Sequence, residues 1–391
     1  MSAYRAFEIG TRYRIRIDVD SITVSRCRFA LARELEEDGS EIRYAGSSAE
    51  MRAGLDRLPD DFREEILVSA LRTAASRYSG RVSLDYNFFD LRRLLSNPEC
   101  GISCKTAKYW ALCGQIWAGN GNSVPIGWSG YGDGLERIRD RRLHDRISWI
   151  MASLESAVPT AEGRFPTILS PQAAAVLLHE SVGHFVEGGD PTTPLNHRLG
   201  IRVAAERIDV VDDPCWAGGA VHYEVDDEGT DVLAPTTVVR NGVLVAQLHS
   251  HSSAAAASTL STANGRAAIW AAPLPRMSNL VCSVGDCSED ALIDQIQNGM
   301  MVHQLADGFG LGAMVEAKVV LAETIKNGRR TGRFTHGGRV RDKVGLMTRA
   351  VALSNRAEVN PNGMCGKRGQ ILFDVGTIAP AIQLSELSLE A

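Results

Sequence analysis

The sequence predicts an α+β protein with two parts, an N-terminal α+β domain over residues 1–158 and a C-terminal domain over residues 159–391. A chain of 391 residues is too long for one small domain. Its first part mixes helical and strand patterns, whereas its second part is rich in β-prone runs joined by Asn-Gly turns. Between them, an apolar stretch ends in histidines and carboxylates. The C-terminal domain is therefore expected to join an antiparallel sheet to one metal-binding helix.

The N-terminal part is expected to contain strands and two long helices. Residues 13–20 alternate apolar and charged side chains, and residues 85–89 favour a second strand. Residues 60–78 and 135–157 carry apolar stripes at helical spacing. The charged face of the second helix is most simply a solvated surface, and a surface that recruits peptides is the alternative. The seven glycines of residues 114–134 predict a long loop or lid.

The C-terminal part is expected to begin with a short strand at residues 167–170 and a helix behind it. Ser170 is a natural N-cap, and Pro171 suits the first helical position. Two-residue hairpins are predicted at residues 241–242 and 327–328, where Asn-Gly separates β-prone runs.

One more helix is predicted in this part, at residues 290–301. Ser288 introduces it, and it should end before the glycine-rich residues 308–312.

Charge and cysteine usage narrow the class of protein. A formal net charge of −5 argues against a nucleic-acid or anionic-membrane partner. The chain shows no signal-peptide layout and no apolar window of ~18 residues, so a cytoplasmic protein is expected. Its eight scattered cysteines are typical of a reducing compartment. The pairs Cys100/Cys104 and Cys282/Cys287 lack the spacing of a structural zinc site and are expected to be free thiols.

The chemistry is concentrated in residues 179–187. His179, Glu180, His184 and Glu187 follow an apolar run, and the two histidines form an H-E-x-x-x-H pattern. At ~100° per residue, positions i and i+5 point about 140° apart on an ideal α-helix. Only a widened turn brings the imidazoles together, so a distorted helix of the π kind is predicted across residues 180–184, with Gly183 as its permissive position. Two ordinary helical histidines without a metal remain the alternative.

Several further motifs follow in a fixed order. They are H-E-S-V-G-H-F-V-E-G (179–188), D-D-E-G-T (226–230), N-G-V-L (241–244), P-R-M-S-N (275–279) and G-M-C-G-K-R-G-Q (363–370). Together they resemble the TldD/PmbA family of metallopeptidases, on its catalytic TldD side, over roughly residues 160–376. The resemblance implies one Zn²⁺ per chain, held by His179, His184 and Cys365.

The implied ligand set assigns roles to the neighbouring carboxylates. Glu180 adjoins the first ligand and is expected to act as the general base toward a metal-activated water. Glu187, three residues after His184, either orients that imidazole by accepting a hydrogen bond from its other ring nitrogen or merely starts the next turn.

Other residues match family positions farther from the metal motif. His249 either helps to polarise a substrate or is an ordinary strand histidine. Arg276 and Asn279 either grip a peptide backbone or fix a turn. The acids at 226–228 could meet a substrate amino group or a metal, but solvated loop acids are the simpler reading.

The resemblance implies a zinc peptidase that acts on small or unfolded peptides or on peptide-derived natural-product precursors. The alternative is a zinc enzyme of the same family that performs another C–N bond reaction on a small metabolite. A non-catalytic assembly subunit is disfavoured because such family members lack the H-E-x-x-x-H residues. The expected assembly is a homodimer, or a heterodimer with a TldE/PmbA-like subunit that lacks the metal.

Overall fold

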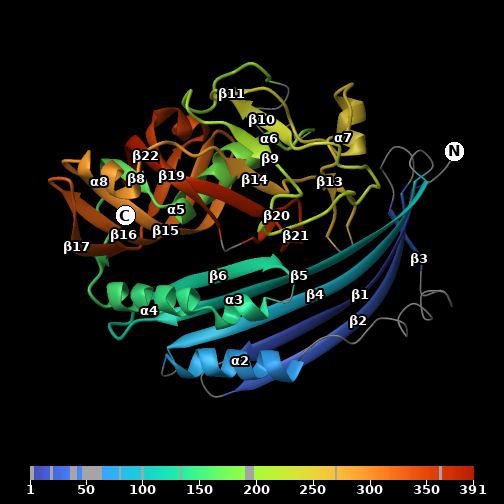
Figure 1. Cartoon of the computed structure of the whole chain (residues 1–391), viewed down its shortest axis with the longest axis horizontal. Helices are drawn as coiled ribbons and strands as arrows, with labels where there is room; N and C mark the ends of the chain where they lie inside the picture. The colour runs from blue at the N-terminus through green and yellow to red at the C-terminus, as the bar shows by residue number, and fades with distance from the viewer. Residues whose placement is uncertain are drawn as a thin grey trace.

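Two curved β-layers form the molecule (Figure 1). The computed structural model describes residues 4–17, 21–35, 42–45, 64–78, 81–97, 101–132, 134–189, 198–268, 271–360 and 363–391. The N-terminal layer is one antiparallel sheet of six long strands, ordered β3-β2-β1-β4-β5-β6. Its strands are β1 (Tyr4–Ile17), β2 (Ile22–Leu35), β3 (Ile42–Ala45), β4 (Val82–Asn97), β5 (Gly101–Trp117) and β6 (Ser123–Tyr131).

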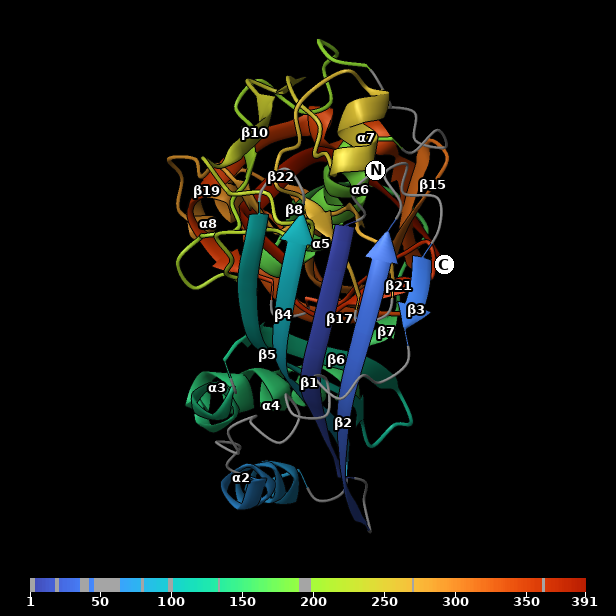
Figure 2. The ribbon, with the colours of Figure 1, turned by 90° about the vertical axis from the view of Figure 1, so that its right-hand side faces the viewer.

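Helices lie beside this sheet at the end opposite the N-terminus (Figure 1, Figure 2). They are α2 (Glu64–Ser76), α3 (Leu135–Arg139) and α4 (Arg141–Glu155). The predicted strands at residues 13–20 and 85–89 fall within β1 and β4, apart from residues 18–20, which lie outside the described part. The predicted helix at residues 60–78 is found as α2, and its residues 60–63 also lie outside.

One expectation for the N-terminal part is wrong, and a second is only partly right. Residues 114–134 form no long loop, because most of them belong to β5 and β6, which pair from Trp117 and Ser123 onward. Gly114 serves close packing, since a Cβ there would lie 2.2 Å from Ser83 O, whereas Gly121 and Gly132 have the positive φ angles of turn residues. The helix at 135–157 is broken at Asp140, whose extended backbone lets its side chain cap α4 by accepting from Arg142 N–H.

The C-terminal layer is a mixed sheet of twelve strands. They are β7 (Val158–Pro159), β8 (Gly163–Leu169), β9 (Val210–Asp212), β10 (Thr236–Arg240), β11 (Val243–Leu244), β14 (Asn279–Cys282), β15 (Asn298–Leu311), β16 (Met314–Lys326), β17 (Arg329–His336), β18 (Arg339–Lys343), β19 (Ala350–Val359) and β22 (Gly376–Glu390). The predicted antiparallel sheet is only partly right, because the pairs β14–β22, β8–β15 and β7–β17 are parallel.

Two small ribbons and several helices complete this layer. The ribbons are β12 (Gly265–Arg266) with β13 (Leu274–Pro275), and β20 (Cys365–Lys367) with β21 (Gln370–Leu372). The helical segments are α5 (Pro171–Leu178), η1 (His179–Gly183), α6 (His184–Val186), α7 (His251–Ala256), α8 (Glu289–Asp294) and η2 (Val344–Arg349). Within the described residues, every helix is too short or too polar to cross a membrane.

Both predicted hairpins are confirmed. Asn241 and Gly242 have φ angles of 47° and 73°, and Asn327 and Gly328 have 51° and 70°, the left-handed pair that tight hairpins require.

The predicted helix at residues 290–301 is wrong in its second half. α8 ends at Asp294, and residues 298–301 already belong to β15. This strand continues to Leu311, so it also includes most of the glycine-rich residues 308–312. A Cβ on Gly299 would lie 2.3 Å from Pro166 O, which shows how closely β15 approaches the segment beside it.

Apolar packing joins the two layers. The core next to the N-terminal sheet includes Val320 and Leu321 of β16 together with residues of α2, α4, β4 and β5. The predicted domain boundary at residue 158 therefore stays a prediction.

The largest core among the described residues surrounds α5, whose Ala173, Ala174 and Ala175 let the helix approach β22 and β15 closely. This packing fixes the direction in which the following residues leave the helix.

Candidate metal centre

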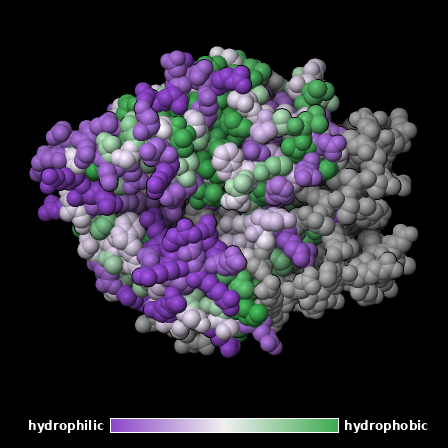
Figure 3. All heavy atoms as spheres, viewed as in Figure 1, coloured by the Kyte–Doolittle hydropathy of each residue, from purple (hydrophilic) through white to green (hydrophobic). Residues whose placement is uncertain are grey.

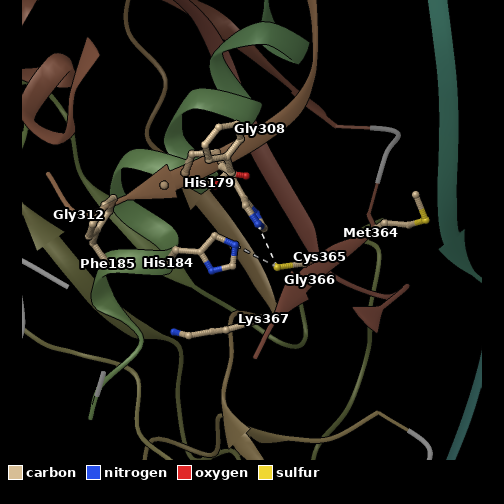
Figure 4. Close-up of a pocket in the computed structure, with 12 residues that line it drawn as sticks. His179, His184, Phe185, Gly308, Gly312, Met364, Cys365, Gly366 and Lys367 are labelled. Atoms are coloured by element: carbon tan, nitrogen blue, oxygen red, sulfur yellow. Dashed lines mark hydrogen bonds between the residues drawn. The ribbon is translucent and has the colours of Figure 1, made fainter. Parts of the chain in front are cut away.

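Three potential metal ligands converge at the end of α5 (Figure 4). His179 Nε2 lies 3.1 Å from Cys365 Sγ, and His184 Nε2 lies 3.3 Å from the same sulfur. All three ligand atoms lie within 4.8 Å of one another. Among the described residues, no other group of three or more His, Cys, Asp or Glu side chains is placed to hold a metal ion. For Zn–S and Zn–N bonds of about 2.3 and 2.1 Å, tetrahedral donors stand roughly 3.6 Å apart. The observed N–S separations of 3.1 and 3.3 Å are shorter than this value by about 0.5 and 0.3 Å, so the donor set suits a zinc ion once the sulfur and the imidazoles move apart slightly.

A π-helical turn brings the two histidines together. After Ser170 caps α5 and Pro171 opens it, residues 179–183 form a π-helix, in which His184 N–H donates to His179 O. The predicted widening of the helix is thus confirmed, but its reason differs. Gly183 has ordinary helical angles (φ −55°, ψ −60°), and a Cβ there would lie 2.1 Å from Met277 Sδ. Close packing, rather than backbone freedom, requires glycine at this position.

Cys365 reaches the histidines from the far end of the chain. It begins the short ribbon of β20 and β21, and its carbonyl accepts a 2.8 Å hydrogen bond from the Arg276 guanidinium. The side chain is buried. Burial alone would raise the pKa of this thiol, but the adjacent imidazoles of His179 and His184 hold its pKa well below the ordinary value. The sulfur is therefore favoured as thiolate, the form that binds metals.

Each imidazole is held through its other nitrogen. His184 Nδ1 lies 2.9 Å from Glu187 Oε2, the position predicted for an orienting carboxylate. His179 Nδ1 lies 3.3 Å from Thr377 Oγ1 on β22. Thr377 was not predicted, because nothing in the sequence indicates that a strand 198 residues away faces this histidine.

Glu187 is the centre of a buried charge network. It accepts hydrogen bonds from Lys367 Nζ at 2.6 Å and Met277 N–H at 3.1 Å, and the Arg276 guanidinium lies 3.4 Å away. Burial would raise the pKa of this carboxyl, yet Lys367 and His184 hold it far below the usual range. Conversely, although burial opposes charging His184, the negative charges of Cys365 and Glu187 raise its pKa well above the usual value.

Glu180 points toward the same cavity from the π-helical turn. Its side chain is buried, and Oε2 has no hydrogen-bond partner within the described part of the chain. Burial raises the pKa of this carboxyl, and the imidazoles of His179 and His184 offset part of that effect. A buried acceptor without a partner is costly. Glu180 Oε2 is thus available to a proton donor that enters the cavity.

The cavity beside these groups has a volume of about 250 Å³. Besides the three ligands, Glu180 and Lys367, it is lined by Phe185, Phe309, Met364 and the glycines 308, 310, 312 and 366. Four of twelve lining residues are glycines, so main-chain groups form much of the wall. The turn-forming residues 188–194, which follow α6, predict a loop that could line a substrate entrance, but the structure describes them only as far as residue 189.

The remaining predicted site residues do not line this cavity in the described structure. His249 is buried beside Gly188, with Nδ1 3.2 Å from Ser253 Oγ. Asn279 accepts from Ala220 N–H and donates to two carbonyls, and Arg276 binds the Cys365 carbonyl. These contacts favour the reading in which Arg276 and Asn279 fix local structure.

The acids at 226–228 are not solvated, which corrects the simpler reading of that motif. Asp226, Asp227 and Glu228 are buried, and each accepts a backbone N–H. Asp227 also pairs with Arg93 of the N-terminal sheet at 2.5 Å. Burial raises the pKa of Glu228 to about 8. This motif joins the two layers and lies outside the metal cavity.

Of the two cysteine pairs, Cys282 and Cys287 are free thiols in the structure. The side chains of Cys100 and Cys104 lie outside the described residues.

Comparison with known proteins assigns the family. Residues 162–391, more than half of the chain, match the family model described as PmbA/TldA metallopeptidase C-terminal domain. A metalloprotease of Methanocaldococcus jannaschii is 31% identical over 319 residues, which cover 79% of this chain and 70% of the relative. The chain belongs to the TldD/PmbA family.

Two further relatives share less sequence identity with this chain. A protein of Saccharolobus solfataricus named zinc metalloprotease TldD homolog is 25% identical over 259 residues, which cover 61% of this chain and 54% of that protein. The crystal structure of TldE from Thermococcus kodakarensis superposes with a TM-score of 0.75 at 17% identity, over 100% of this chain and 96% of that one. The whole α+β fold, including the divergent N-terminal layer, is therefore that of the TldD/PmbA family.

Proposed function

We propose that this TldD/PmbA protein is a zinc-dependent peptidase that hydrolyses amide bonds of small or unfolded peptides or of peptide-derived natural-product precursors. One observation carries the proposal: a buried cysteine sulfur and two oriented imidazoles share a cavity with a carboxyl group that has an unpartnered oxygen among the described residues. Zn²⁺ bound by His179, His184 and Cys365 would supply Lewis-acid catalysis and acidify a water molecule.

The chain's own residues supply the proton transfers and the orientation. Glu180 accepts the proton of the attacking water at Oε2 and delivers it to the leaving amine, which restores the carboxylate. Glu187 and Thr377 hold the imidazoles, so that their Nε2 atoms face the sulfur. The glycine-lined wall offers main-chain groups to a substrate, which supports recognition of the peptide backbone over particular side chains.

Glu180→Gln tests the central role. The variant should keep one zinc per chain and lose roughly 100- to 10,000-fold in kcat, the usual contribution of a general base. Hydrolysis of an internally quenched peptide library and metal analysis measure the two quantities. Glu206→Gln, an exposed glutamate elsewhere, is the control. Full activity of Glu180→Gln would overturn the assignment.

The small cavity favours a second candidate. A volume of about 250 Å³ is below the roughly 300–1,000 Å³ of pockets for drug-sized ligands. A zinc enzyme that performs another C–N bond reaction on a small metabolite fits such a space. If the purified protein cleaves no peptide of the library but converts a small amide, this second candidate is favoured.

We also propose that the chain is the catalytic member of a dimer, either with a second copy or with a TldE/PmbA-like subunit that lacks the metal. The presence of all three donors and Glu180 supports the catalytic assignment. Sedimentation analysis and an activity assay of the chain alone separate these cases. An active dimer would indicate the homodimer, whereas an inactive monomer would indicate that the second subunit is required.

A further inference from the structure

A second and larger cavity lies between the two layers. Its volume is about 1,140 Å³, and we call it the arginine–tryptophan groove after its characteristic lining residues, Trp110, Trp128, Trp216, Arg137, Arg139 and Arg142. The strands β5 and β6 and the helices α3 and α4 supply one wall, and residues 215–222 of the C-terminal layer supply the other. Neither the proposed hydrolysis nor the TldD/PmbA motifs use this groove.

The aromatic floor of the groove is tightly packed. Gly134, at the start of α3, has a φ of +69°, and a Cβ there would lie 2.3 Å from the Trp110 ring. Trp110 is therefore pressed against the backbone of the helix start. Above it, Trp216 and Tyr131 remain 40% and 52% exposed, which is unusual for such large side chains and leaves their faces open to a partner.

The lining carries three arginines, Arg137, Arg139 and Arg142, against two acids, Glu136 and Asp140, so these groups leave it with an excess of one positive charge, although the protein as a whole carries a net charge of −5. Asp140 lies 3.6 Å from Arg137 and 2.9 Å from Arg142, so those two cations share one carboxylate. Arg139 is exposed and forms no ion pair with any described residue. Figure 3 shows the hydrophilic surface over α3 and α4. Guanidinium groups beside exposed aromatic rings suit a ligand with carboxylates and aromatic side chains.

The groove also lies close to the ligand loop. Ser129 lines the groove, and its hydroxyl accepts a 2.7 Å hydrogen bond from Gly363 N–H, two residues before Cys365. Two residues of chain span at most about 7 Å. At ~3.3 Å per residue, this span corresponds to about two residues of an extended peptide, so the wall of the groove at Ser129 lies within a few residues' reach of the loop that carries Cys365.

We propose that the arginine–tryptophan groove binds an acidic, aromatic segment of the substrate peptide, a few residues from the bond that is cut. The proposal rests on the peptidase function proposed above, and it extends that function with a preference for part of the substrate. The solvated face predicted for residues 135–157 is thereby assigned to peptide recruitment, the alternative left open by the sequence.

Calorimetric binding to the full-length Glu180→Gln protein tests the groove without requiring hydrolysis. The probes are three peptides: acetyl-Glu-Trp-Glu-Phe-Glu-Ala-Ala-Ala-amide, the same peptide with lysine for glutamate, and the same peptide with alanine for both aromatic residues. The acidic aromatic peptide should bind most tightly. Adding Arg139→Glu or Trp216→Ala should weaken its binding about five- to tenfold, the effect typical of a contact residue near an interface centre.

Arg141→Glu is the matched control, because Arg141 is a neighbouring exposed arginine that does not line the groove. Its affinity should stay within about twofold of the parent, as expected for a surface charge away from the contact. Equal affinity of the parent and Arg139→Glu proteins, or equal binding of the lysine peptide, overturns the proposal. So does conversion of a dimer to a monomer by Trp216→Ala, which would make the groove an interface between copies.

The same proteins separate this inference from the peptidase function. If the protein with intact Glu180 cleaves no peptide while binding still depends on Arg139, the peptidase function fails and the groove stands as a peptide site. If cleavage occurs and binding is indifferent to Arg139 and Trp216, the groove proposal fails alone.

Discussion

Gly308 provides a sharp test of the Glu180 assignment, because it perturbs the carboxylate without touching a metal ligand. Gly308 lies in β15 directly over Glu180. A Cβ added to Gly308 would lie 2.9 Å from both Cγ and Oε1 of Glu180 and 3.0 Å from Val176 Cγ1. Since ordinary contact begins at 3.4 Å, the carboxylate must move by at least 3.4 − 2.9, or 0.5 Å.

The expected magnitude follows from this displacement. A catalytic group misplaced by about 1 Å costs roughly 100-fold in rate. The Gly308→Ala variant should therefore lose about tenfold in kcat, less than Glu180→Gln loses, because the base is displaced but still present. KM should change little, since the glycine wall keeps its main-chain groups.

The assay combines kinetics on the quenched peptide library with zinc analysis and a melting curve. Zinc content should remain at one per chain, because no donor atom moves. Gly345→Ala is the control, since a Cβ on Gly345 has no neighbour within 4 Å. If Gly308→Ala matches the wild type while Glu180→Gln is inactive, the geometric reasoning is refuted. Loss of zinc in Gly308→Ala would equally contradict it.

Three further changes probe the ligands and the buried acids. Cys365→Ser removes the sulfur donor and should leave the purified protein with far less than one zinc per chain by metal analysis; full occupancy would exclude this ligand. Thr377→Val keeps the shape of the side chain but removes the hydroxyl beside His179 Nδ1, so the dissociation constant for zinc, measured by chelator competition, should rise roughly tenfold. Glu228 has a pKa raised to about 8 from 4.5, so the folded protein holds an extra proton between these values and loses stability as pH rises through them. In thermal melts, the melting temperature of Glu228→Gln should therefore lie a few degrees above that of the wild type at pH 9 and close to it at pH 5. The opposite trend would show that the carboxyl is ionised in the folded protein.

Local patterns predicted the helix that carries His179 and His184 well. The N-cap at Ser170 and the helix start at Pro171 depend only on neighbouring residues. The spacing of His179 and His184 demanded a widened turn, and the π-helix is found there. The Asn-Gly hairpins were predictable for the same reason, since a two-residue turn is set by the residues within it.

Glycine patterns misled the prediction where their cause was tertiary. Gly114 signalled a loop, but it lies within β5, where its small size lets Ser83 approach; Gly134 combines a positive φ with room for the Trp110 ring. Gly183 was assigned backbone freedom, yet its small size is what Met277 requires. A glycine required for close approach looks the same in sequence as one required for a turn.

The sequence by itself determined the helix that carries His179, Glu180 and His184, because hydrogen bonds within one segment decide that geometry. It also suggested Cys365, but only through resemblance to a family. The tertiary structure alone decided that this sulfur, 181 residues from His184, meets the imidazoles, that Thr377 and Lys367 complete the surroundings, and that the acids at 226–228 are buried. Contacts between distant segments depend on how sheets and helices pack, and periodicity along one segment carries no record of that packing.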